Sequence, residues 1–225
     1  MTAAEWTAVW LSLKVGIVGA LASLPFALGV AYLLARGRFY GRTALDILVH
    51  LPLVLPPVVT GWLLLIAFGR HGPLGVLFER AFGVVFAFRW TGAALAAGIM
   101  GFPLMVRAIR LSIEAVDRRL EDAAATLGAG RARIFLTLTL PLALPGVGAG
   151  LILGFAKAIG EFGATITFVA NIPGQTQTLA TAIYNTTQDP DGGAATWRLT
   201  GVAIAIAVVA LTLSEALSSR WMRAR

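Results

Sequence analysis

The stretch "LEDAAATLGAGRARIFLTLTLPLALPG", from Leu120 to Gly146, separates two long apolar blocks and combines charged and small residues with glycines. Its first half is expected to form a short helix capped by Asp117, since aspartate accepts backbone N–H groups at a helix start. Four apolar side chains share one face of that helix: Leu120, Ala123, Ala124 and Leu127. Gly128 and Gly130 favour a left-handed helix end and a sharp turn.

The second half of the stretch predicts another short helix over 131–140. Ile134, Phe135 and Leu138 fall on one side of it, and Pro141 then begins the next apolar stretch. Residues 117–141 therefore predict a helix–turn–helix elbow. Its alanines are small enough for the backbone of another protein to approach closely.

The composition indicates a membrane protein. Of the 225 residues, 58% are hydrophobic and 13% are charged, and the mean hydropathy is +0.82. A soluble domain usually carries about 25% charged residues. The apolar residues also occur in runs long enough to cross a bilayer. Without cysteine, the chain has neither disulfides nor thiolate metal sites.

We expect an all-α, polytopic integral membrane protein with a single transmembrane domain over 1–225. Five segments are long enough to span about 30 Å of hydrocarbon. They are residues 7–35, 45–68, 90–113, 142–169 and 199–217. The N-terminus lacks the basic and small-residue features of a signal peptide.

The arginines predict the orientation. Twelve follow or flank spans on one side: Arg36, Arg38, Arg42, Arg107, Arg110, Arg118, Arg119, Arg131, Arg133, Arg220, Arg223 and Arg225. Four lie on the other side: Arg70, Arg80, Arg89 and Arg198. By the positive-inside rule, the elbow and the C-terminus are cytoplasmic and the N-terminus is outside. The net charge of +7 is thus explained by topology and does not indicate nucleic-acid binding.

The elbow resembles a loop of the permease subunits of ABC importers, with the form E-A-A, three residues, G, nine residues, I-x-L-P. Asp122 stands for the glutamate, directly after Glu121, and Leu138 stands for the isoleucine. In that family the elbow is the coupling helix, which contacts the ATP-hydrolysing subunit, in a type I ABC importer permease fold. The resemblance implies a coupling role for Glu121, Asp122, Ala123, Ala124, Gly128, Leu138 and Pro141.

Three further stretches, "HLPLVLPPVVTGWLLL", "FPLMVRAIR" and "GEFGATITFVANIPGQTQT", resemble the molybdate branch of this family. The segment Gly160–Ala164 is shared with sulfate permeases, which usually carry an additional N-terminal span. The resemblance implies a molybdate permease of the inner membrane that works as a homodimer, with sulfate, thiosulfate or tungstate as alternative substrates. It also implies two cytoplasmic ATPase subunits, which hold ATP and magnesium, and an external molybdate-binding protein. No cofactor is expected on this chain itself.

Lys157 and Glu161 are charged residues four positions apart in or near a span. They can neutralise each other along one helix face, or they can form a gate, because ionisable residues within a membrane are candidates for function. Uncharged polar side chains follow at Thr165, Thr167 and Asn171. These three can pass a dianion without trapping it, or they can bond neighbouring helices.

Other features have structural and functional readings. Gly146, Gly150 and Gly154 recur every four residues and favour close helix packing. Prolines at 52, 56 and 57 predict either a kink in the second span, satisfied by neighbouring helices, or a broken segment that lines the pathway. His50 and His71 have no ligand partners in the sequence and are expected to be structural. The polar segment 171–197, with a short helix over 179–186, and the region 69–89 are candidate outer surfaces for a binding protein.

Other classes of membrane protein lack support in the sequence. An enzyme needs a nucleophile with its base or a set of metal ligands, and neither pattern is present. A Walker A motif is also missing, so ATP hydrolysis must belong to a partner. A channel without an ATPase partner remains the alternative of a different class, although a channel has no need of the elbow.

Overall fold

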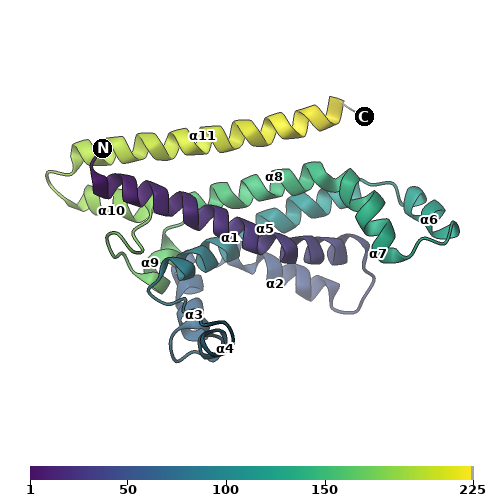
Figure 1. Cartoon of the computed structure of the whole chain (residues 1–225), viewed down its shortest axis with the longest axis horizontal. Helices are drawn as coiled ribbons and strands as arrows, with labels where there is room; N and C mark the ends of the chain where they lie inside the picture. Colours follow the sequence, from purple (N-terminus) through teal and green to yellow (C-terminus); the bar gives the residue numbers. More distant parts are fainter. Residues whose placement is uncertain (224–225) are drawn as a thin grey trace.

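The computed structural model describes the backbone of residues 1–223 and the side chains of residues 1–216. All regular elements in this part of the chain are helices, and the longest of them run roughly along the long axis of the molecule (Figure 1). The predicted cytoplasmic arginines Arg220, Arg223 and Arg225 lie outside the residues whose side chains are described.

Three helices form the centre of the molecule: α1 (Ala3–Arg36), α5 (Trp90–Glu114) and α8 (Leu140–Ile159). Helix α5 packs against both of the others. The contacts are close because small residues line them. A methyl group on Gly19 of α1 would lie 2.6 Å from the carbonyl oxygen of Ala94, and one on Gly154 of α8 would lie 2.7 Å from the sulfur of Met105. The close packing predicted for the glycines of α8 is therefore confirmed.

Two charged residues in the first half of helix α1 have partners that explain their positions. Glu5 forms a capping box with Thr2 and accepts a hydrogen bond of 2.6 Å from Arg198, which joins the start of α1 to α11 (Gly193–Arg223). Lys14 lies 3.7 Å from the centre of the Trp90 ring. This cation–π contact stabilises an ammonium group on a helix that is otherwise apolar.

The second predicted span, 45–68, is broken in the structure. It consists of α2 (Arg42–Val54) and α3 (Pro57–Phe68), which meet at an angle of 114°. Pro56 and Pro57 provide the physical reason, because proline has no N–H to continue the helical hydrogen bonds and forces the preceding residue into an extended conformation. The predicted break is therefore present, whereas a place of this segment in the pathway stays a prediction.

The turn between the elbow and the fourth span also differs from the prediction. Helix α7 (Arg131–Ile134) continues through a π-helical turn, Phe135–Thr139, into α8. The result is one apolar helix of 29 residues, Arg131–Ile159, so the span does not begin at Pro141 as predicted. In the π turn the N–H of Leu140 donates to the carbonyl of Phe135. This wider spacing lets the helix continue past a proline that has no N–H of its own.

The fourth predicted span, 142–169, is divided as well. Helix α8 ends at Ile159, and α9 (Gly163–Val169) begins after a break of three residues. Gly163, the first residue of α9, allows close packing on α3, because a Cβ atom there would lie 2.7 Å from Cβ of Pro57. Within the described residues, four helices are long and apolar enough to cross a membrane, or five if α2 and α3 form one crossing.

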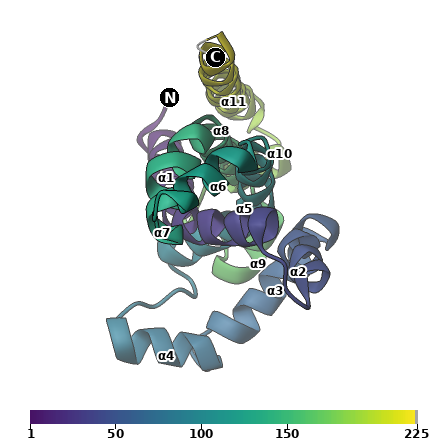
Figure 2. The same ribbon diagram turned by 90° about the vertical axis from the view of Figure 1, so that its right-hand side faces the viewer.

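The remaining helices extend from the central bundle. Helix α4 (Pro73–Phe82) follows α3, and both project from its side (Figure 2). Helix α10 (Leu179–Gln188) contains the short helix predicted in the polar segment and packs against α1 and α11. It lies with the N-terminus at one end of the molecule, whereas α6 (Arg118–Thr126) and the end of α11 lie at the other (Figure 1).

Candidate functional site

The elbow predicted from the sequence is present at one end of the molecule. Asp117 caps α6 by accepting the N–H of Arg119 at 2.9 Å, and no residue of α6 is buried. Gly128 has the predicted left-handed conformation, with φ of +84°. Gly130 was predicted to share it, but its φ is −69° because it instead precedes the first turn of α7 in an extended conformation.

Glu121 attaches α6 to the rest of the protein. Its carboxylate lies 3.0 Å from Nε of Arg36, the last residue of α1, and accepts a hydrogen bond of 2.7 Å from the hydroxyl of Thr139 in the π turn. Arg36 also donates to the carbonyl of Val116 at 2.8 Å, just before α6. Because the side chains of Arg36 and Glu121 are only 10% and 16% exposed, this pair links α1, α6 and the start of the long helix.

Arg118, at the start of α6, also donates to the carbonyl of Ala35 at 3.3 Å, whereas most of the remaining side chains of α6 are exposed. Asp122 and Ala123 are exposed, and Ala124 is half-buried. Leu127, which follows α6, has 88% of its surface exposed and is the most prominent apolar side chain of the elbow. A cluster of small and apolar side chains at an exposed helix end is suited to contact another protein.

Leu138 and Pro141 lie on the long helix that supports α6, and only Pro141 of the two is exposed. Leu138 is half-buried within the π turn, and Pro141 lies in the first turn of α8. Between them, Thr139 is almost completely buried, with 1% of its surface exposed. This part of the long helix is thus connected to α6 by the hydrogen bond from Thr139 to Glu121.

The second candidate site lies at the break between α8 and α9. Nζ of Lys157 is 3.0 Å from Oε2 of Glu161, and the Glu161 side chain is only 2% exposed. The other oxygen of Glu161 accepts the N–H of Ala164 at 2.9 Å. The predicted pair therefore exists, and its carboxylate also holds the beginning of α9 in place.

The predicted polar side chains beyond Glu161 have different environments. Thr165 is buried, with 1% of its surface exposed, whereas the hydroxyl of Thr167 donates to the carbonyl of Gly163 at 2.8 Å. The side-chain oxygens of Asn171 and of Thr60 on α3 are buried without a hydrogen-bond partner. Helix α3 packs directly on α9, and Asn171 follows α9 by two residues, so each of these neighbouring segments contributes one buried hydrogen-bonding group without a partner.

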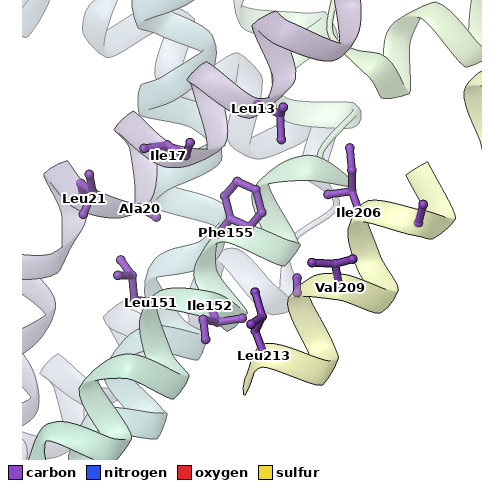
Figure 3. A pocket seen from close by; sticks show the side chains of 12 residues that line it. Leu13, Ile17, Ala20, Leu21, Leu151, Ile152, Phe155, Ile206, Val209 and Leu213 are labelled. Carbon is purple, nitrogen blue, oxygen red and sulfur yellow. The ribbon is translucent and has the colours of Figure 1, made fainter. Parts of the chain in front are cut away.

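An apolar groove elsewhere is a poor site for an anion. Helices α1, α8 and α11 enclose about 520 Å³, lined by twelve side chains that are all hydrocarbon. Among them are Leu13, Ile17, Phe155, Val209 and Leu213 (Figure 3). Placing an ion in an apolar environment without hydrogen bonds is strongly unfavourable. Among the described residues, no group of three or more His, Asp or Glu side chains is arranged to bind a metal ion.

Sequence patterns did not identify two residues that hold the elbow in place. Arg36 was interpreted only as a topological charge, and Thr139 was not singled out. Arg36 lies 85 positions from Glu121 and Thr139 lies 18 positions away, so no helical spacing connects them. The only available signal was that Arg36 ends an apolar helix directly before Gly37.

The chain is similar to known membrane transport proteins along almost its whole length. Residues 23–224 match the family model of the "binding-protein-dependent transport system inner membrane component". The molybdenum transport system permease protein ModB of Escherichia coli K12 is 55% identical over 215 residues, which cover 96% of this chain and 94% of that protein. A more distant relative, the sulfate transport system permease protein CysT of Salmonella typhimurium LT2, is 34% identical over 94% of this chain and 76% of its own length.

A solved structure has the same fold. A chain from inward-facing conformations of the MetNI methionine ABC transporter superposes with a TM-score of 0.74, over 98% of this chain and 99% of that one. The two sequences are 14% identical, so the likeness concerns the fold alone. The predicted type I ABC importer permease fold is confirmed by this agreement.

Proposed function

The chain belongs to the family of binding-protein-dependent transport system inner membrane components, and we propose that it is the permease subunit of an ATP-driven molybdate importer. The observation that carries this proposal is the 55% identity with a molybdenum transport permease over 96% of the chain. The lower identity of 34% with a sulfate permease favours molybdate over sulfate.

The proposed importer contains two copies of this chain, with the pathway between them. Two cytoplasmic ATPase subunits bind ATP with magnesium and contact α6, and an external protein delivers molybdate to the opposite end. The exposed leucine at position 127 supports ATPase docking at α6. In this arrangement the N-terminus is outside and the C-terminus is cytoplasmic.

The long helix provides a physical route from the elbow to the second site. When ATP binding draws the ATPase subunits together, α6 moves with them, and the bonds from Glu121 transmit this movement to α1 and to the π turn. The continuous helix of 29 residues is about 43 Å long at 1.5 Å per residue. Its far end carries Lys157, immediately before the break that positions α9. We infer that this break is the gate.

Selection of the anion is assigned mainly to the external binding protein. The candidate pathway residues offer one ammonium group, already paired with Glu161, and several uncharged hydrogen-bonding groups. Such a lining passes an oxyanion without holding it tightly. The alternative of a channel without an ATPase leaves the exposed elbow unexplained.

The absence of cysteine makes docking at α6 directly testable. A photoreactive benzophenone maleimide attached to Leu127→Cys is expected to crosslink the permease to the ATPase subunit on illumination. Tyr184→Cys serves as the control because Tyr184 is exposed on α10, at the other end of the molecule. Crosslinking to the ATPase from position 184, and none from position 127, would contradict both the docking surface and the proposed orientation.

A further inference from the structure

A groove beside the elbow combines apolar walls with positive charge. It lies between the second half of α1 and the turn formed by α7 and the π helix, and it has a volume of about 980 Å³. Tyr32 and Phe135 meet edge to face across it, with ring centres 4.8 Å apart. Pro25, Leu28 and Leu140 contribute to its apolar part.

The charged end of the groove carries arginines without counter-charges. Arg38 and Arg131 line it, both are exposed, and in the described part of the chain neither forms an ion pair with a carboxylate. Arg36 also lines the groove but is held by Glu121. Since no acidic side chain lines the groove, an anion would complement it.

The dimensions of the groove correspond to one leaflet of a bilayer. On α1 the lining runs from Pro25 to Arg36, about 16 Å at 1.5 Å per residue, and half of the hydrocarbon core measures about 15 Å. Phe39 and Tyr40, both exposed, follow directly. Aromatic residues at this position are typical of the headgroup level. A groove that spans one leaflet would place these arginines at the height of the lipid phosphates.

We propose that this groove binds an anionic phospholipid, with its phosphate between Arg38 and Arg131 and an acyl chain along the apolar wall of α1. The arginines lie at one end of an apolar channel of about leaflet length. A phospholipid fits both parts of this site, whereas a small soluble anion would occupy only the charged end. A bound lipid would contact both α1 and the turn that supports the elbow, and so would stabilise the position of α6.

The shape of the groove can be changed without changing its charge. Gly29 lies on the exposed side of α1 and lines the groove. A Cβ atom at this position would have no other atom within 4 Å. Gly29→Leu therefore fits without a clash, and leucine is a better helix former than glycine. Its side chain fills space that the acyl chain would occupy.

The test uses the assembled transporter in nanodiscs with equal amounts of phosphatidylglycerol and phosphatidylcholine, followed by native mass spectrometry of the retained lipids. The wild type is expected to retain phosphatidylglycerol preferentially. An arginine at an anionic lipid surface changes binding by a factor of about five, so the double variant Arg38→Gln/Arg131→Gln is expected to lower this preference about 25-fold. Gly29→Leu is expected to lower retention of phosphatidylglycerol with all arginines present.

Arg133→Gln is the matched control, since Arg133 is an exposed arginine two positions from Arg131 that does not line the groove. Its lipid preference is expected to equal that of the wild type. Equal retention of the two lipids by the wild type, or an undiminished preference in the double variant, would overturn the proposal. Displacement of the lipid by millimolar inorganic phosphate would also overturn it, because the site would then bind a small soluble anion.

Discussion

Replacing Glu121 with alanine is expected to lower ATP-driven molybdate uptake about 100-fold while the permease still inserts into the membrane. The change removes the ion pair with Arg36 and the hydrogen bond from Thr139. Losing one partner of a buried charge pair costs about 3–5 kcal/mol, and partial exposure of this pair favours the lower end of that range. About 3 kcal/mol corresponds to roughly a 100-fold change in the equilibrium between attached and released positions of α6.

Uptake into vesicles, divided by the amount of permease in the membrane, measures this effect. Glu215→Ala is the matched control because it removes the same side chain from an exposed position of α11, outside the elbow. We expect ATPase binding to persist in Glu121→Ala, since the exposed face of α6 is unchanged, but hydrolysis to be uncoupled from transport. Full uptake by Glu121→Ala would contradict the role of this residue in transmitting movement.

Glu161→Gln is expected to reduce uptake by 10- to 100-fold and to alter the ratio of ATP hydrolysed to molybdate transported. Glutamine can still accept the N–H of Ala164, but it leaves Lys157 without its counter-charge. Glu161 is 2% exposed, whereas the Lys157 side chain is 30% exposed and partly solvated. We therefore expect an energetic effect of about 1.5–3 kcal/mol, below that of a fully buried pair.

A double-mutant cycle distinguishes a charge effect from a loss of structure. Lys157→Met removes the ammonium group, so Lys157→Met/Glu161→Gln contains no unpaired charge at the break. If the unpaired lysine causes the defect, the double variant is expected to recover part of the uptake lost in Glu161→Gln. Normal uptake and normal basal ATPase activity in Glu161→Gln would instead make the pair dispensable to gating.

The positions of the membrane-spanning helices were largely predictable, because a run of apolar residues or a regular glycine spacing can be recognised within one stretch of sequence. The span 90–113 corresponds closely to α5, Trp90–Glu114. The helix breaks were less predictable: the prolines at 56 and 57 permitted both a kink and the 114° bend. At Pro141 a local rule gave the wrong boundary, because the π turn lets the helix continue.

The candidate sites were predictable only where their contacts are local. The spacing of four residues placed Lys157 beside Glu161, and the distance of 3.0 Å agrees with it. The bonds from Glu121 to Arg36 and Thr139 connect distant parts of the chain and depend on how α1 packs against the π turn. Hydrophobic patterns do not encode these side-chain pairs, so the attachment of the elbow became visible only in the structure.

Uptake of labelled molybdate into proteoliposomes tests the proposed importer most directly. The vesicles contain this chain with its ATPase subunit, and the external binding protein and unlabelled sulfate are added in turn. We predict uptake only when the ATPase, ATP and the binding protein are all present, with little competition from an equal concentration of sulfate. Uptake at the same rate without the ATPase subunit would contradict the importer and identify a channel.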